Sequence, residues 1–363
     1  MDGSLYRALV FLFMLPGLAQ ADSVNAEWVS TTRALTMGNV GIASSDDPTT
    51  AAFYNPAGLA RAKKASFEVF NPQIDFGFGN FSLSKSAVDW GKHASYNAAK
   101  EMVKAKPGKA SSVGFSLYPN VSSQNFSFGV LGRMHRWSYY RQSDQTWRYQ
   151  SRYLIVPSLG LSMGIMGGRV RFGAAVRAIQ VTETNGIVAD TGSTILTNES
   201  TGEGLGVGLD AGMLITMPWS SLPSLGLVAR NVGDTAFPTR GLVKWGGGQK
   251  VNHAKIKMMY DAGVAITPKI GQKDTLTLAV DMRDIQNRSE VRALRHFNVG
   301  MEFAFSKKLY LRAGYSQAYW TAGIGLASKQ GALDLGSYAD ELDSVAAGAV
   351  EDRKFSLRYT RRF

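Results

Sequence analysis

Residues 31–61 have the sequence TTRALTMGNVGIASSDDPTTAAFYNPAGLAR. They precede a long series of alternating segments, and they are too polar and too rich in Gly, Ala and Ser to be a strand of that series. Pro56 disfavours the helical region for Asn55, which should therefore be extended. The Asn55 side chain can then bond nearby backbone amides, as in an Asx turn. Residues 46–50 should form a turn followed by the start of a short helix. Taken alone, this pattern also fits an ordinary capped loop before the first strand.

Residues 1–21 have the three regions of a secretory signal peptide. Arg7 supplies the positive start, residues 8–18 are apolar, and residues 19–21 form a small-x-small cleavage site. A short buried helix is the alternative interpretation. We expect a cleaved signal peptide over residues 1–21 and a mature chain that starts near Asp22.

Composition excludes several classes of protein. The chain has 363 residues, no cysteine and a formal charge of +12. Without cysteine, disulfide scaffolds, thiol catalysis and thiolate metal sites are excluded. Lys and Arg are scattered instead of clustered on one element, which argues against nucleic acid as a partner. No apolar run approaches the roughly 18 residues of a membrane-spanning helix.

From residue 65 onward, apolar and polar residues alternate with period two, which indicates strands with two different faces. Residues 275–282 and 297–305 are clear examples. Many runs have nearly the length that a tilted membrane-spanning strand needs. We predict fourteen strands, near residues 65–81, 109–118, 124–139, 146–163, 168–182, 204–216, 223–231, 254–267, 273–283, 293–305, 309–317, 320–328, 331–338 and 353–363.

The connections between these strands alternate in length. Every second connection is short: residues 119–124, 165–167, 217–222, 268–271, 306–308 and 329–330. The others include the long polar stretches 83–108, 183–203, 232–253 and 339–352. Short periplasmic turns that alternate with long extracellular loops are typical of outer-membrane barrels. An even number of strands also returns the C-terminus to the periplasm.

The last strand is amphipathic and ends on an aromatic residue. Phe355, Leu357, Tyr359 and Phe363 share one face, which only Arg361 interrupts. Such an end resembles the assembly signal of bacterial outer-membrane barrels, which implies that Tyr359 and Phe363 are recognised by the barrel-assembly machinery. Other aromatic residues near strand ends should form the interfacial girdles: Tyr118, Trp137, Trp147, Trp219, Tyr315 and Trp320.

Residues 53–59, Phe-Tyr-Asn-Pro-Ala-Gly-Leu, resemble the signature of the FadL-like superfamily of long-chain fatty-acid transporters. The match includes residues 33–38, Arg-Ala-Leu-Thr-Met-Gly, and the Ala/Ser/Asp/Pro run between the two. Residues 309–342 resemble the closing hairpins of TraF-like and PorV-like members. The resemblance implies a hatch over residues 22–64 inside a barrel over residues 65–363. In that hatch, Asn55, Pro56, Ala57 and Gly58 would fix the conformation.

Motifs for catalysis and cofactor binding are weak. Ser162 lies in a Gly-x-Ser-x-Gly pattern, but a strand and a tight turn surround it instead of the strand–turn–helix elbow that a nucleophile requires. Residues 202–208 are rich in glycine, but no helix follows to bind phosphate, so they fit a strand start better. Four histidines lack metal-ligand spacing: His93, His135, His253 and His296. We predict no catalytic residue, no cofactor and no metal.

The inward faces of the predicted strands carry charges of both signs, since charged residues on a membrane strand must avoid lipid. Two interpretations are open. The charges could form a solvated, salt-bridged lumen, or arginines near the hatch could contact the carboxylate of an amphipathic ligand. The candidates for such contacts are Arg133, Arg171, Arg177 and Arg312. The full inward set is Arg133, His135, Arg171, Arg177, Asp210, Arg230, Asp261, Asp281, Arg312, Asp334 and Arg358.

Residues 84–106 are compatible with a helix, because Val88, Ala99, Met102 and Val103 fall on one side at helical spacing. This stretch could be an extracellular lid, part of an internal plug, or a plain surface helix in the first loop.

The predicted fold is all-β: a fourteen-stranded antiparallel transmembrane β-barrel in the outer membrane of a Gram-negative bacterium, with an N-terminal hatch in the lumen. The resemblance implies passive uptake of a hydrophobic or amphipathic, fatty-acid-like small molecule, with outer-membrane lipid around the barrel. Two alternatives are a barrel that docks a protein partner at its rim and a general diffusion porin.

Overall fold

The computed structural model describes residues 30–44, 47–84, 96–189, 201–238, 251–252, 254–289, 291–342 and 350–363. The predicted signal peptide, the first residues of the predicted hatch, His93 and His253 lie outside these ranges. Within them, no helix has both the length and the apolar character to cross a membrane.

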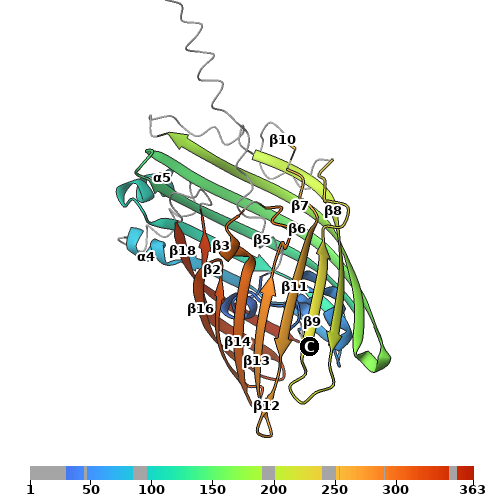
Figure 1. Ribbon diagram of the computed structural model, residues 1–363. Helices are drawn as coiled ribbons and strands as arrows, with labels where there is room; N and C mark the ends of the chain where they lie inside the picture. The colour runs from blue at the N-terminus through green and yellow to red at the C-terminus, as the bar shows by residue number, and fades with distance from the viewer. Residues whose placement is uncertain are drawn as a thin grey trace, which may run out of the picture.

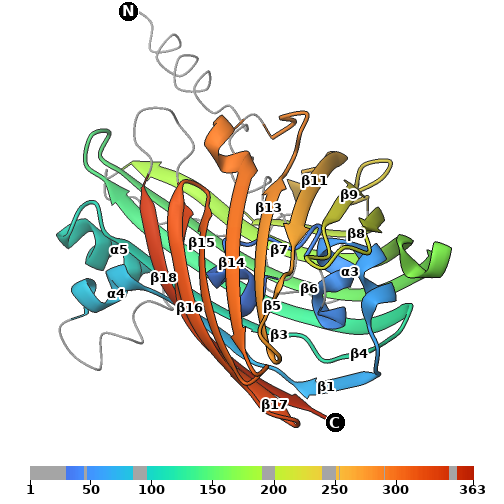
Figure 2. The same ribbon diagram turned by 60° about the horizontal axis from the view of Figure 1, so that its bottom comes forward.

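The described residues form a closed antiparallel barrel of fourteen strands (Figures 1 and 2), as predicted. Three of the strands consist of two pieces, and the short β10 (Val251–Asn252) pairs in parallel with β8. In chain order the strands are β1 (Ser66–Phe70) with β2 (Gln73–Gly77), β3 (Ala110–Leu117) with β4 (Asn120–Ser123), β5 (Phe126–Arg141), β6 (Thr146–Ile165), β7 (Val170–Ala189), β8 (Thr201–Thr216), β9 (Ser224–Arg230), β11 (Met259–Ile266) with β12 (Lys269–Ile270), β13 (Asp274–Met282), β14 (Phe297–Phe305), β15 (Leu309–Ser316), β16 (Tyr319–Ala327), β17 (Gly331–Glu341) and β18 (Glu351–Arg362).

The barrel closes where β18 pairs with β1 and β2. Along β14 and β18 the burial of side chains alternates almost residue by residue, so the period-two pattern correctly predicts which face lies inward. Apolar side chains cover the outward face, including Val299, Met301 and Leu357. This arrangement suits a barrel wall that faces lipid outside and polar groups inside.

Several predicted boundaries are wrong. The strand predicted over residues 168–182 continues as β7 to Ala189, and Ala293–His296, predicted as the start of a strand, forms the 3-10 helix η4. The first strand ends at Gly77, and residues Phe78–Leu83 form helix α4 instead of continuing to residue 81. The helix is stabilised by Asn80, whose amide bonds the backbone of Ser112 in β3. The connection over residues 119–124 is also shorter than predicted, because β4 resumes directly after Pro119 and pairs with β5. A proline lacks the backbone donor of a strand residue, so it interrupts the strand without ending it.

The strands β5, β6 and β7 extend well beyond a bilayer. The strands β6 and β7 have 20 residues each, whereas about 9–11 residues suffice for a tilted spanning strand. Helix α5 (Tyr96–Ala105) packs through Val103 on the outward side chains Trp147 and Tyr149 of this extension (Figures 1 and 2). Residues 84–106 therefore contain a helix on the outside of the barrel, which does not fit the alternative of an internal plug; Val88 lies outside the described residues.

Three aromatic residues depart from the predicted girdles. Tyr118 is buried inside the barrel against Phe53, with ring centroids 5.3 Å apart. The indole of Trp137 donates to Gln150, which is on the inward face of β6. Trp147 faces outward but is covered by α5. Tyr118 lies at the break between β3 and β4, and Trp137 and Trp147 lie where β5 and β6 extend beyond the bilayer. A position near the end of a predicted strand therefore did not place these residues at a membrane interface.

Candidate functional site

The residues before the barrel, 30–44 and 47–64, form three short helical turns that we call the N-terminal segment. They are α2 (Thr32–Thr36), α3 (Pro48–Tyr54) and the 3-10 helix η1 (Pro56–Arg61). Each begins at a residue whose side-chain oxygen accepts a backbone N–H, as N-caps do: Thr31, Asp47 and Asn55. Proline at the first position of α3 and η1 suits a helix start. The expected helix start at residues 46–50 is confirmed for its described part.

Asn55 joins three parts of the molecule. It is extended, with φ −151° and ψ 106°, and it is fully buried. Its amide nitrogen donates to the carbonyl oxygens of Ile42 (2.8 Å) and Met213 (3.1 Å), and its side-chain oxygen accepts from Ala57 N (3.1 Å). The extended backbone and the Asx-type bond are as predicted. The bond to Met213, which lies on β8, was not predictable from local sequence.

The barrel wall opposite the N-terminal segment is lined with glycine. A Cβ added to Gly212 would overlap the Oδ1 atom of Asn55, and one added to Gly173 would overlap the backbone of Pro56. On the other side of the barrel, a Cβ on Gly300 would overlap the carbonyl oxygen of Met37. The segment therefore contacts the backbone of the strands directly, and side chains at these positions would displace it.

Glu302 is the main anchor of helix α2. Its carboxylate accepts two hydrogen bonds from Arg33, at 2.9 and 2.7 Å, and a third from Arg312 at 2.6 Å. Arg312 also pairs with Asp334 at 2.6 Å. On the next strand, Asp281 accepts from the backbone N–H groups of Gly41 (2.7 Å) and Ile42 (3.0 Å).

A second anchor holds the end of helix α3. Arg230 donates to the carbonyl oxygens of Phe53 (2.6 Å) and Tyr54 (3.1 Å) and pairs with Asp261. Arg177 donates to the carbonyl oxygen of Ala52 (3.2 Å), pairs with Asp210 and lies over the Phe53 ring. Last-turn carbonyls of a helix lack partners within the helix, so two guanidinium groups satisfy them here.

An apolar cluster of buried side chains lies beside Phe53, on the inward faces of β5, β6 and β7. Phe53, Tyr118 and Phe237 belong to it, and Phe237 rests on Gly204 and Gly206 of β8. The glycine-rich residues 202–208 are thus part of a strand, as predicted, and the missing side chains make room for this phenyl ring. The members of this cluster on the three strands are Leu131, Leu154, Val156, Ala175, Ile179 and Val181.

The turn that carries Phe237 is tied to the same ion pairs. Asn231 N donates to Asp210 Oδ1 at 2.9 Å, so Asp210 bonds both this turn and Arg177. At the outer side of the turn, Asp234 accepts from Met258 N at 2.6 Å and pairs with Lys255 at 2.8 Å. The hydrogen bond from Lys255 lowers the pKa of the Asp234 carboxyl below its ordinary value.

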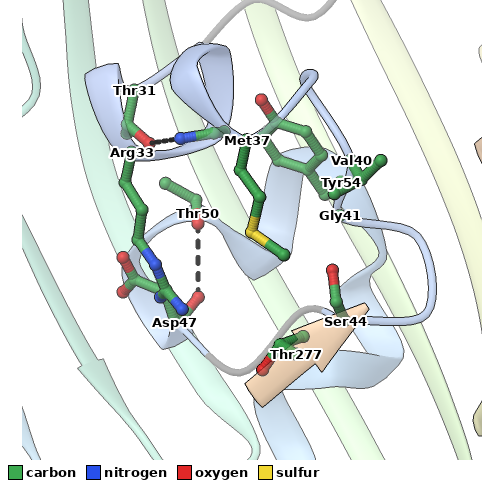
Figure 3. Close-up of a pocket in the computed structure, with 11 residues that line it drawn as sticks. Thr31, Arg33, Met37, Val40, Gly41, Ser44, Asp47, Thr50, Tyr54 and Thr277 are labelled. Atoms are coloured by element: carbon green, nitrogen blue, oxygen red, sulfur yellow. Dashed lines mark hydrogen bonds between the residues drawn. The ribbon is translucent and has the colours of Figure 1, made fainter. Parts of the chain in front are cut away.

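A small, partly open pocket lies within the N-terminal segment, next to Thr277 of β13 (Figure 3). Figure 3 shows Met37 extending into it, with Arg33 and Asp47 together at one side. The lining is mixed in polarity. Nearly all of its lining belongs to the N-terminal segment, so the pocket exists only while the segment stays in place.

Solved structures with the same architecture are outer-membrane transporters. No protein-family model and no curated protein sequence matches the chain. The toluene transporter TbuX of Ralstonia pickettii matches with a TM-score of 0.54 and 13% identity, over 93% of this chain and 99% of that one. The toluene transporter TodX of P. putida matches with a TM-score of 0.52 and 10% identity, over 92% and 98%. CymD, a monoaromatic hydrocarbon channel, matches with a TM-score of 0.55 and 10% identity, over 93% and 98%. The chain has the FadL-like barrel fold. The resemblance noted in residues 31–61 and 309–342 is confirmed at the level of the fold.

The four predicted ligand-contacting arginines lie on three strands of this FadL-like barrel. Arg177 and Arg312 are buried and paired with carboxylates. Arg171 donates to the hydroxyl of Thr216 at 3.0 Å, and Arg133 lies on β5, half-buried. Their contact with a ligand stays a prediction, and for two of them it would compete with an existing ion pair.

The described residues hold no group of three or more His, Asp or Glu that could bind a metal ion. Ser162 lies within β6, which is followed by a 3-10 turn and β7 instead of a helix. His135 contacts Lys354 at 2.9 Å, and His296 contacts the carbonyl oxygen of Arg283. These contacts are structural.

The C-terminal residue, Phe363, continues the pairing between the last strand and the first strand of the barrel. Phe363 N donates to the carbonyl oxygen of Phe67 at 3.0 Å, while its ring is 73% exposed. The Arg361 guanidinium lies 5.5 Å from the centroid of that ring, so it reaches toward the end of the strand instead of into the lipid-facing zone. Recognition of Phe363 and Tyr359 by the assembly machinery stays a prediction.

Proposed function

We propose that the protein is an outer-membrane channel for the passive uptake of small hydrophobic molecules, with the N-terminal segment as its hatch. The observation that carries this proposal is the apolar cluster on the inward wall, which the N-terminal segment covers. The lumen of a diffusion porin is polar and filled with water. Here Leu131, Val156 and Ile179 face inward and are buried together with Phe53 of the N-terminal segment. When the segment moves away, this wall would offer an apolar solute a surface at which it gains free energy, whereas an ion would gain none.

An uncharged hydrocarbon suits this apolar wall better than a fatty acid. Arg177 borders it beside Phe53, and this guanidinium already holds the carboxylate of Asp210. A ligand carboxylate would have to displace a buried partner. The names of TbuX, TodX and CymD, which refer to toluene and monoaromatic hydrocarbons, support the same choice.

Replacing Phe237 with alanine tests this assignment. The phenyl ring packs into the apolar cluster, so its removal should open an apolar space there, raise the uptake of toluene severalfold and leave the flux of a sugar such as sucrose unchanged. Uptake of radiolabelled solutes by cells with an intact lipopolysaccharide outer membrane that express the protein provides the measurement, because toluene crosses plain phospholipid bilayers without a channel. The matched control is Val207→Ala, because Val207 lies on the outward face of β8 and is 65% exposed. Cells with the wild-type protein that admit toluene no faster than cells without it would contradict the proposed function.

Replacing Asn55 with alanine tests the hatch. The change leaves the buried carbonyl oxygens of Ile42 and Met213 and the N–H of Ala57 without their partner. Each unsatisfied group costs about 1–3 kcal/mol, which is enough to loosen the segment while the strand ladder stays intact. We expect normal assembly, faster proteolysis before residue 65 and loss of substrate-specific uptake. Gln124→Ala, in an exposed turn, is the control. Unchanged uptake by correctly inserted Asn55→Ala protein would show that Asn55 has no such role.

A further inference from the structure

Helices α4 and α5, with the turn that follows α5, form an elbow on the outside of the barrel, which we call the outer elbow (residues 78–83 and 96–109). Both views place it beside β18 and β3, outside the ring of strands (Figures 1 and 2). The Phe78 ring stacks on Phe355, with centroids 4.3 Å apart, and Phe355 is on the outward face of β18. The elbow therefore touches the wall that faces lipid.

The outer elbow is fixed to that wall by packing and hydrogen bonds. Leu83 and Val103 are buried against Tyr140 and Trp147 of the β5–β6 extension. The Asn80 side chain donates to Ser112 O at 2.6 Å and accepts from Ser112 N at 3.1 Å. A surface held in this way presents its remaining side chains in a constant arrangement, which favours a specific ligand over diffuse attraction.

The position of the outer elbow corresponds to the boundary between the hydrocarbon core and the headgroups of the bilayer. Toward the short turns, the neighbouring outward residues Ile74, Phe115 and Leu357 are apolar and exposed, as lipid contacts are. Phe78 and Phe81 of α4 are 39% and 54% exposed, although both are large and apolar. Aromatic side chains are enriched where hydrocarbon meets headgroups.

Helix α5 and the turn after it carry a group of lysines. Lys104, Lys106 and Lys109 are exposed and Lys100 is half-buried, while Glu101 is the one acidic residue in this stretch. Lys106 donates to the carbonyl oxygen of Ser82, which ties α5 to α4. Exposed aromatic residues next to a group of lysines are the composition of a surface that binds anionic lipid, each lysine near the membrane contributing about 1 kcal/mol.

We propose that the outer elbow binds the phosphorylated headgroup of lipid A, the bisphosphorylated glycolipid of the outer leaflet. The elbow lies in the connection between the first two strands, at the end of the barrel with the long connections, which is the outer side when the short turns are periplasmic. Several lysines, each a compact point charge, suit a headgroup with more than one phosphate. The inference does not depend on which solute the barrel admits.

The test compares lipid retention by the full-length protein and two triple variants in nanodiscs. One variant carries Lys100→Gln, Lys104→Gln and Lys109→Gln and keeps Lys106, which bonds the elbow. The matched control carries three exposed lysines from the short-turn end as glutamine: Lys307, Lys308 and Lys329. The nanodiscs contain phosphatidylcholine with either lipid A or phosphatidylglycerol at equal phosphate. Mass spectrometry counts the lipid that stays bound after detergent exchange.

Wild-type protein should retain lipid A in preference to phosphatidylglycerol. The elbow variant should bind it at least tenfold more weakly, since each lysine lost corresponds to roughly a fivefold change, and the control should match wild type. The melting temperature in pure phosphatidylcholine should be equal for all three, which separates lost binding from lost folding. Equal retention of lipid A by the elbow variant, or equal retention of both anionic lipids by wild type, would overturn the proposal.

Discussion

Gly212→Leu is expected to turn a closed barrel into an open pore. Gly212 pairs with Gly173 on one side and Val228 on the other, so its strand cannot move away. A Cβ at this position would overlap Asn55 Oδ1 and lie 3.0 Å from Pro56 Cδ. The segment is held to the wall by separate side-chain contacts and not by a strand ladder, so it must yield before the strands do.

Conductance in planar bilayers measures the result. Wild-type protein should show little steady current, and the Gly212→Leu protein should show large, stable channels. The matched control is Ala211→Leu on the same strand, because Ala211 points outward and is exposed. Gly212→Leu protein that folds, as judged by heat-modifiable migration in gels, and yet conducts like wild type would show that the N-terminal segment does not block the lumen.

Asp210→Asn is expected to cause the largest loss of stability among single substitutions of the wall. Asp210 is buried, pairs with Arg177, lies 3.8 Å from Arg230 and accepts from Asn231 N. Removing its charge leaves the Arg177 guanidinium buried without a counter-ion. Breaking a buried ion pair in this way costs about 3–5 kcal/mol.

A thermal melt in detergent checks this prediction, with Asp144→Asn as the control. Asp144 pairs with Arg148 at 2.9 Å in the exposed turn between β5 and β6, where an ion pair contributes about 0–1 kcal/mol. The melting temperature should fall clearly for Asp210→Asn and hardly at all for Asp144→Asn. Protease sensitivity before residue 65 should rise only for the first, because Arg177 also holds the carbonyl oxygen of Ala52. Equal melting temperatures would mean that Asp210 is not needed to hold this network.

The barrel could be predicted because its signals are local. A strand in a barrel wall alternates between two faces, so residues 297–305 predict β14 without any knowledge of its neighbours. The cap at Asn55 is local as well, because its oxygen bonds an amide two residues away. The departures occur where distant contacts intervene: α4 replaces the end of a predicted strand because Asn80 and Phe78 find partners on β3 and β18.

The candidate site depended on contacts that no local pattern contains. The period-two pattern identified Arg177, Asp210 and Arg312 as residues that face the lumen. It did not identify which charged side chains pair with them. Arg33 and Glu302 are 269 positions apart in the chain, and they meet only because the barrel closes around the N-terminal segment. Gly212 and Gly173 likewise make room for Asn55 and Pro56 only because the strand register places the two glycines side by side. Strand character follows from backbone geometry and immediate neighbours, whereas these pairings follow from register and closure, which the tertiary structure alone decides.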